Sequence, residues 1–403
     1  MTRVDSWLLA LCASRTFMTF TSMTYAATLP ILRGAWEMSA TAAGSISTGF
    51  HLGSAVSLLF CSWLADRVGA RRVYLWSAGL ATVAALAFAF FARSYLSGLV
   101  LYTLVAVSQG GTYTTGIMLI ADRHPPARRG GAMGWFLASS SLGYTFSLLL
   151  AGVAVRIGGY PAAFFATACG PLVGGVLGLL ALWSTADVIH ARPQGERFGP
   201  AVLRNGPAMR LMLGYIFHSW ELVGMWAWTP AFLAAALIVS GVGGTSAVAQ
   251  GAYLTAAFHV MGLVASSMTG RLSDRLGRRD VLVGVAAIST ICSFVFGWLI
   301  GWPAAVIFLV GALYSFMAFG DSPVLTTAFT EAVSPAYLGS ALAIRSLFGF
   351  GAGAIAPLAF GVVLDLTNPP GLRPTHWGWA FVTLGLGGLG ATLCAWGLKP
   401  GRR

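Results

Sequence analysis

Residues 270–279 read Gly-Arg-Leu-Ser-Asp-Arg-Leu-Gly-Arg-Arg, a basic stretch with a single acid between two long apolar segments. Residues 62–71, Ser-Trp-Leu-Ala-Asp-Arg-Val-Gly-Ala-Arg, repeat the pattern. Three positions recur at a constant offset of 208 residues: Asp66 at Asp274, Gly69 at Gly277 and Arg71 at Arg279. His51 and His259, each fifteen residues before the aspartate of its loop, follow the same offset. We therefore interpret the chain as two copies of one unit.

Composition identifies the surroundings of this unit as a lipid bilayer. Of the 403 residues 57% are hydrophobic and 9% are charged, and the mean hydropathy is +0.77, whereas a soluble domain has about 25% charged residues. The net charge of +12 does not indicate nucleic-acid binding, because the basic residues form short clusters between apolar segments, as in membrane proteins. The five cysteines lie inside apolar segments without ligand-like spacing, so we predict neither a metal site nor a cofactor.

The apolar segments predict an all-α integral membrane protein. A helix needs about 20 apolar residues to cross the hydrocarbon, and segments of this length occur twelve times. A polar stretch, 185–208, divides them into an N-terminal six-helix bundle at 1–184 and a C-terminal one at 209–403. The twelve predicted spans are 5–32, 41–64, 73–92, 95–121, 130–156, 160–184, 209–238, 246–272, 281–301, 303–331, 336–364 and 376–397.

The distribution of basic residues predicts the orientation in the membrane. With the N-terminus inside, eighteen lysines and arginines fall on the cytoplasmic side and four on the opposite side. Cytoplasmic loops of membrane proteins are enriched in these residues, so we expect both termini in the cytoplasm. Lys399 is the only lysine beside many arginines, a usage typical of a GC-rich bacterial genome. We therefore expect a multi-pass protein of the bacterial inner membrane, present as a monomer.

The duplicated loops and the six-plus-six arrangement resemble the major facilitator superfamily. The second loop fits the signature of that superfamily, with Gly270, Asp274, Arg275, Gly277, Arg278 and Arg279; the first has Ser62 and Ala70 at two of these positions. The resemblance implies two pseudo-symmetric six-helix bundles that rock around a site near the bilayer midplane. It also implies that the loops act as gates. Asp66 would meet the start of span 11, near 334–336, and Asp274 the start of span 5, near 130–133, when the cytoplasmic side is closed. The alternative is that the loops only set topology.

Two departures from the resemblance bear on the type of transporter. Proton-driven drug exporters carry an arginine three residues before a Gln-Gly pair in span 4, where this chain has Ala106 before Gln109-Gly110. They also carry a Gly-Pro break in span 5, where this chain has Gly143-Tyr144. Both differences argue against an ordinary drug–proton exchanger.

Charged residues inside the predicted spans are the candidate site, because a charge at a helix centre costs about 3 kcal/mol. Arg15 and Glu221 lie near the midplane at nearly equivalent positions of the two copies, so they form either a static ion pair or a substrate site in which Glu221 carries the proton. His218 we interpret as a core residue. The candidates for binding substrate or protons are Arg15, His51, Glu221, His259, Asp321 and Arg345.

Each of the remaining candidates has a structural alternative. Asp321, in the stretch Gly-Asp-Ser-Pro at 320–323, could cap a broken helix instead of binding a ligand. Arg345 could extend its guanidinium to the cytoplasmic surface. His51 and His259 are a symmetric pair and are expected to converge on the central cavity.

These residues predict the kind of substrate. Two arginines and two histidines against two acids leave the cavity neutral to positive, which favours a small anion or a zwitterion. We therefore predict a secondary transporter coupled to protons, most simply a symporter, with anion exchange as a close alternative. A second hypothesis is export of an amphipathic compound by proton antiport, and a third is a membrane sensor without transport. No motif of the sequence indicates an enzyme.

Overall fold

The computed structural model describes residues 5–189, 204–333, 338–369 and 376–399, and all regular elements of these ranges are helices. Apolar runs of more than 18 residues form the long helices, as expected where the backbone must satisfy its own hydrogen bonds. The elements are α1 (Ser6–Met18), η1 (Thr19–Thr21), α2 (Thr24–Ala35), α3 (Ala40–Val68), α4 (Ala70–Phe91), α5 (Tyr95–Arg123), α6 (Pro126–Leu182), α8 (Gly206–Val239), α9 (Gly244–Leu276), α10 (Arg278–Phe296), η2 (Gly297–Leu299), α11 (Ala304–Ala332), α12 (Leu338–Thr367) and α13 (Gly378–Trp396).

The helices account for the predicted membrane crossings. Ten helices of the described ranges are long and apolar enough to span a bilayer. One of them, α6, has 57 residues and is interrupted by non-helical backbone at Gly158 and Gly159, so it crosses and returns as two spans. The first predicted span is present as two shorter helices, α1 and α2. With these two features the twelve predicted spans all have a helical counterpart.

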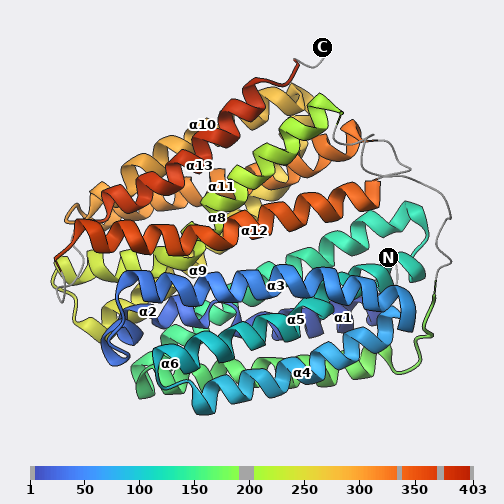
Figure 1. Ribbon diagram of the computed structural model, residues 1–403, viewed down its shortest axis with the longest axis horizontal. Helices are drawn as coiled ribbons and strands as arrows, with labels where there is room; N and C mark the ends of the chain where they lie inside the picture. Colours follow the sequence, from blue (N-terminus) through green and yellow to red (C-terminus); the bar gives the residue numbers. More distant parts are fainter. Residues whose placement is uncertain (1–4, 190–203, 334–337, 370–375, 400–403) are drawn as a thin grey trace.

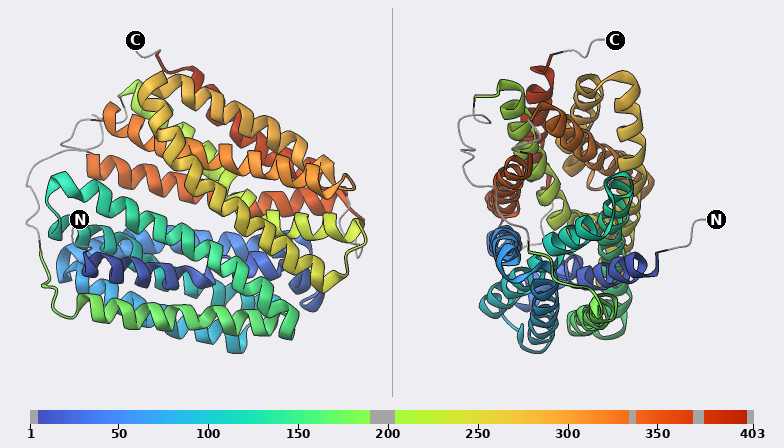
Figure 2. Two further views of the ribbon diagram at one scale, coloured as in Figure 1. Left: turned by 180° about the vertical axis from the view of Figure 1, so that it is seen from behind. Right: turned by 90° about the vertical axis from the view of Figure 1, so that its right-hand side faces the viewer.

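Two bundles lie side by side, one made from α1 to α6 and the other from α8 to α13 (Figures 1 and 2). They meet chiefly where α3 packs on α12 and α6 packs on α9. The end of α6 and the start of α8 lie at the same end of the molecule, which we call the linker end; the opposite end is the far end. The boundaries proposed for the linker, 185–208, remain a prediction, since residues 190–203 lie outside the described ranges.

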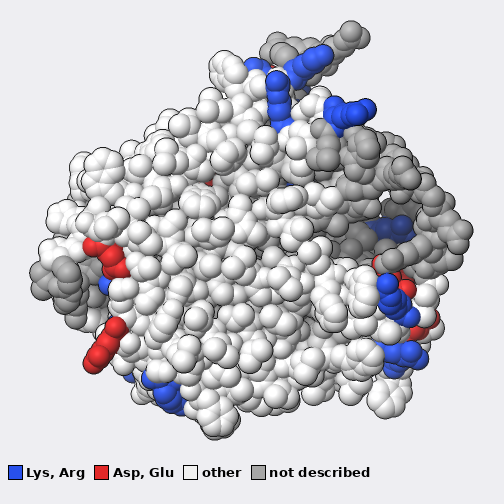
Figure 3. Space-filling model, viewed as in Figure 1, with Lys and Arg blue, Asp and Glu red and all other residues white. Residues whose placement is uncertain are grey.

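Charged side chains gather at the two ends of the molecule and leave an uncharged band between them (Figure 3). This distribution is the one that a bilayer requires around a spanning protein. At the linker end the surface is hollowed between the two halves (Figure 3).

The duplicated loops have the same backbone geometry and the same kind of contact. Gly69 and Gly277 have φ of 98° and 93°, a region that favours glycine. Arg71 donates to the carbonyl of Leu182 at the end of α6 (2.8 Å), and Arg279 donates to the carbonyl of Trp396 at the end of α13 (3.3 Å). Each loop therefore binds the C-terminus of the last helix of its own half, where a cation is favoured by the helix dipole.

At the far end the two halves are in close contact. A methyl group added to Gly44 would collide with the backbone of Pro357, and one added to Gly361 would collide with the backbone of Ala40. Small residues allow such close approach of membrane helices. A second contact joins apolar residues of both halves, among them Ala27, Leu148, Val248 and Ala252. The far end is therefore closed while the linker end is hollowed.

Asp365 of α12 strengthens this closure from the second half. Its carboxylate accepts hydrogen bonds from the backbone amides of Ala40 (2.8 Å) and Thr41 (2.7 Å) and from the Thr41 hydroxyl (2.7 Å). The amides at the start of α3 have no partner within their own helix, and an anion there is also favoured by the helix dipole. Asp365 thus caps a helix that belongs to the other half.

We predict that replacing Asp365 with asparagine weakens far-end closure. The variant loses charge-assisted hydrogen bonds that contribute on the order of 1–2 kcal/mol, so the population open at the far end should increase several-fold. Pulsed spin-label distances between cysteines placed at Arg93 and Trp302, in a background where the five native cysteines are replaced, would measure this shift. Asp365→Glu, which keeps the charge, is the control; an unchanged distance distribution in Asp365→Asn would contradict the capping role.

Candidate functional site

The first span is broken in the middle of the N-terminal bundle. The sequence predicts one helix over 5–32, but the structure has α1, a 3-10 turn at 19–21 and then α2. The carbonyls released by the break are bound by α5: Gln109 Nε2 donates to the carbonyl of Met18 (2.8 Å), and the Tyr102 hydroxyl donates to the carbonyl of Ser22 (2.7 Å). Discontinuous helices near the midplane form binding sites in transporters, because their non-helical backbone lines a cavity.

Arg15 lies one turn before this break and is held by the N-terminal half. Its side chain is 6% exposed. Nε donates to the Ser140 hydroxyl and Nη1 to the Thr112 hydroxyl, both at 2.8 Å, and the guanidinium lies 5.2 Å from the centre of the Tyr113 ring. These partners are neutral, so the positive charge of Arg15 is not cancelled by an acid among the residues described.

Arg345 is the corresponding cation of the C-terminal half. It is 6% exposed, its guanidinium lies 4.0 Å from the centre of the Tyr215 ring, and Nη2 donates to the Thr326 hydroxyl (3.3 Å). Nε and Nη1 are buried and have no hydrogen-bond partner within the described ranges. In this structure Arg345 therefore does not extend to the surface, and its guanidinium faces the Tyr215 side chain.

Tyr113 connects the two cations. Its hydroxyl interacts electrostatically with Arg15, with Arg345 and with Tyr215. Because Tyr113 belongs to α5 and Tyr215 to α8, the interface between the halves is lined here by two tyrosines with an arginine beside each. An anion at this place would meet a guanidinium from either half.

Glu221 lies within the C-terminal bundle and does not pair with Arg15. The Ser289 hydroxyl of α10 donates to Glu221 Oε1 (3.0 Å), and the carboxylate packs against Gly388 of α13. Among the described residues no ion pair joins it to Arg15. The proposed static pair is therefore absent from this structure, because Glu221 faces α10 and α13 instead of the first half.

Asp321 and His218 form a buried carboxylate–imidazole contact close to Glu221. His218 Nδ1 lies 2.8 Å from Asp321 Oδ1, and both side chains are at most 3% exposed. Helix α11 is continuous through Asp321, so this residue does not cap a broken helix. Glu221 and Asp321 also interact electrostatically. Three titratable groups thus share the interior of one bundle.

His51 and His259 line two small pockets that share the Trp226 side chain. His51 lines one together with Ser22 of the break, and the empty volume there is about 270 Å³ including its open part. His259 lines the other, with an empty volume of about 190 Å³ measured in the same way. The two histidines, equivalent in the duplication, therefore lie on either side of one tryptophan of α8.

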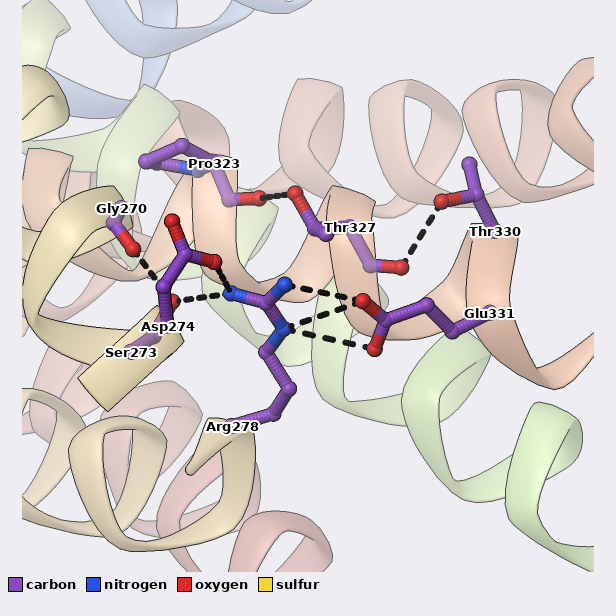
Figure 4. Close-up of polar contacts among 8 residues, drawn as sticks. All are labelled: Gly270, Ser273, Asp274, Arg278, Pro323, Thr327, Thr330 and Glu331. Carbon is purple, nitrogen blue, oxygen red and sulfur yellow. Dashed lines mark hydrogen bonds and ion pairs between the residues drawn. The ribbon is translucent and has the colours of Figure 1, made fainter. Parts of the chain in front are cut away.

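The second loop makes an ion-pair network within the C-terminal half (Figure 4). Arg278 lies between two acids, with Nη1 at 2.5 Å from Asp274 Oδ1 and Nη2 at 2.8 Å from Glu331 Oε1. The proposed contact of Asp274 with the start of the fifth span is not made here. The proposed partner of Asp66, near 334–336, lies outside the described residues, so that pairing stays a prediction.

Several residues of the site were not among the sequence candidates. His218 was interpreted as a core residue, and its pairing with Asp321 depends on how α8 and α11 are rotated. Tyr215 and Gln109 carry no charge, so a search for buried charges does not select them. A search for polar residues within apolar spans would have found Gln109, since buried amides are uncommon there.

We predict that Gln109→Leu destabilises the protein. The carbonyl of Met18 and the Thr21 hydroxyl, which receives a bond of 2.6 Å from the same amide, would lose their partner, at a cost of about 1–3 kcal/mol. Chemical unfolding in mixed micelles would measure the loss. Ser108→Leu, one residue earlier on the exposed side of α5, is the control, and equal stability of the two variants would show that the break does not need Gln109.

Comparisons with known proteins agree with this architecture. The profile of the Major Facilitator Superfamily matches residues 11–320. The inner membrane metabolite transport protein YgcS of Escherichia coli (strain K12) is 28% identical over 116 residues, which are 29% of this chain and 26% of YgcS. Similar solved structures include a D-xylose-proton symporter (TM-score 0.76, 16% identity, covering 98% of both chains) and a bacterial homologue of the lysosomal transporter Spinster in an inward-facing, unoccupied conformation (TM-score 0.73, 17% identity, covering 97% of this chain and 95% of that one).

The profile match covers more than half of the chain, and the fold and the duplicated loops are those expected for such a protein. The chain is a multi-pass membrane protein that belongs to the Major Facilitator Superfamily.

Proposed function

We propose that the protein is a proton-coupled transporter of a small organic anion, either a carboxylate or a zwitterion, in a bacterial inner membrane. The observation that carries the proposal is the state of the two arginines. Arg15 and Arg345 are buried at the interface between the halves, and neither has an acidic partner among the described residues. A buried charge without a counter-ion is costly, and an anion would remove that cost.

The second half contains the titratable side chains that would bind a proton. Along α8 the Arg345 guanidinium contacts Tyr215, the Tyr215 ring lies 5.8 Å from the His218 ring, and His218 pairs with Asp321. Two contacts, Arg345–Tyr215 and Tyr215–His218, therefore connect a bound anion to the titratable side chains of His218, Asp321 and Glu221. A proton taken up by this group would neutralise one of its acids when the anion neutralises an arginine. The substrate and the proton would then cross together with little net charge in the bilayer.

The basic residues of the loops support a cytoplasmic linker end, as the sequence predicts. With that orientation the hollow between the halves opens to the cytoplasm and the far-end contacts close the outer side. The alternatives have less support. An exporter of amphipathic cations would not need two cations at its interface, and a sensor without transport would be expected to hold its buried charges in fixed pairs.

The proposal predicts that carboxylates bind to the purified protein. Thermal stabilisation would be measured with acetate, succinate, phenylacetate, phosphate, glycine, glucose and a lipophilic cation, followed by calorimetry. We expect carboxylates to stabilise the protein and the lipophilic cation to have no effect. In Arg15→Gln and Arg345→Gln the affinity should fall at least tenfold, because a charge-assisted hydrogen bond contributes about 1.5–3 kcal/mol. Arg93→Gln, an exposed arginine of the far end, should bind as the unmodified protein does. Stabilisation by the cation alone would refute the anion class.

Proton coupling predicts a specific defect for Glu221→Gln. A permanently neutral residue at this position cannot release a proton, so accumulation driven by a pH gradient in liposomes should be lost. Exchange of labelled for unlabelled carboxylate, which needs no net proton movement, should continue. Glu37→Gln removes an exposed acid of the far end and is the control. Full gradient-driven accumulation in Glu221→Gln would exclude this residue as a proton carrier.

The gating role of the loop is tested with Asp274→Asn. Under the proposal Asp274 contacts the first half only when the linker end is closed, so the variant should favour the state open at that end. Transport should slow several-fold while carboxylate affinity stays the same or rises. Asp280→Asn is a matched control, because Asp280 lies in the same loop and pairs with Arg279 (3.0 Å). Normal transport by Asp274→Asn would leave the loop with a topological role only.

A further inference from the structure

Three buried polar atoms point to a second part of the substrate site. The side chains of Trp226, Thr229 and His259 all line the smaller of the two pockets. Trp226 Nε1, Thr229 Oγ1 and His259 Nδ1 are each buried without a hydrogen-bond partner in the described ranges. Thr229 and His259 are 3% exposed. Leaving a buried donor or acceptor unsatisfied costs about 1–3 kcal/mol, so three in one pocket indicate that a polar group binds there.

The donor and acceptor roles of these three atoms indicate which chemical group of a ligand would bind there. The indole N–H can only donate, the threonine hydroxyl can donate or accept, and a neutral histidine nitrogen can accept. A hydroxyl oxygen satisfies this set, since it accepts from Trp226 and donates to His259. With Nδ1 of His259 as the unprotonated nitrogen, a carbonyl oxygen would leave that nitrogen without a donor, and a cation would face the indole N–H. The rest of the lining combines apolar side chains such as Met225 and Phe258 with the hydroxyls of Thr255 and Ser315.

The surroundings of the pocket are aromatic. The His259 ring lies 5.4 Å from Phe319, 5.7 Å from Trp226 and 6.1 Å from Tyr144, measured between ring centres. These separations are typical of rings that interact through their faces and edges. A flat aromatic ring bearing the hydroxyl would extend this cluster, whereas a flexible aliphatic chain would gain less from it.

The cluster lies near the proposed anion site. Ser140, which binds Arg15 at 2.8 Å, is four residues from Tyr144 on α6, and residues four apart share one face of a helix with a rise of about 6 Å. The distance from the Arg15 guanidinium to the aromatic cluster is therefore on the order of 10 Å. An aromatic acid with a short side chain between ring and carboxylate reaches across this distance.

We propose that Trp226, Thr229 and His259 form a subsite for a ring hydroxyl, and that the substrates are hydroxylated aromatic carboxylates. This inference rests on the proposed function, because it assumes that the carboxylate binds at Arg15 and Arg345. The halves of the transporter then recognise different ends of one molecule: Arg15 of the first half takes the carboxylate, and α8 and α9 of the second half take the hydroxyl.

The test compares two ligands that differ by one hydroxyl. Calorimetry with the full-length protein would measure the binding of 3-(4-hydroxyphenyl)propionate and of 3-phenylpropionate. We expect the hydroxylated acid to bind about tenfold more tightly, because a site built for a hydroxyl is left with unpaired groups by the analogue that lacks it. Thr229→Val and Trp226→Phe each remove one polar atom and keep most of the shape. Each should reduce the preference to about twofold by weakening only the hydroxylated acid.

Thr255→Val is the matched control. Thr255 lines the same pocket, but its hydroxyl already donates to the Gly251 carbonyl (2.8 Å), so its removal should leave the tenfold preference unchanged. If both acids bind equally to the unmodified protein, the pocket holds only a trapped water and the inference is overturned, while the proposed anion transport stands. If neither acid nor any other carboxylate binds, the proposed function itself fails.

Discussion

The interior of a bilayer offers no hydrogen bonds, so each polar group within these helices must find its partner inside the protein. Most do. The break in the first span is possible because Gln109 and Tyr102 bind the carbonyls that it releases, and Arg15 is held by two hydroxyls. His218 and Asp321 pair with each other. Among the buried groups that remain without a partner in the described residues are those of Arg345 and those around Trp226, and these lie at the candidate site.

These two sets of unsatisfied groups differ in kind. Arg345 presents excess positive charge, whereas the pocket of Trp226 presents a mixed set of neutral donors and acceptors in an aromatic environment. A ligand that satisfies both must itself have a charged end and a neutral polar end. Under the proposed function, specificity would therefore come from the spacing between the anion site and the pocket of Trp226. Both halves contribute residues to the interface where these two sites lie. Rocking of the halves would change that spacing and so weaken the binding in the other state.

Much of the fold could be predicted from the sequence, because its causes are local. The length of the apolar segments predicts the membrane-spanning helices, and the repeat at Asp66 and Asp274 predicts the duplication of the six-helix unit. The break after Arg15 could not be predicted, since the residues at 19–23 have no proline or glycine and their conformation depends on Gln109 of another helix. For the site, hydropathy predicted a depth for Arg15 and Arg345, whose side chains are buried, but it could not predict the rotation of each helix. The depth of Glu221 suggested an ion pair with Arg15, whereas its rotation on α8 directs it to Ser289.

Because α3 and α12 approach closely at Gly44 and Gly361, a single substitution there can change which conformation of the protein is favoured. Both positions lie at the far end beside the Asp365 cap, away from Arg15 and Arg345, and the halves meet there through glycine hydrogen atoms. A larger residue at either position would separate the bundles there and favour a conformation that is open at the far end. The resting state of the transporter, and with it the side from which substrate is first captured, can thus be changed by a single methyl group without altering what is recognised.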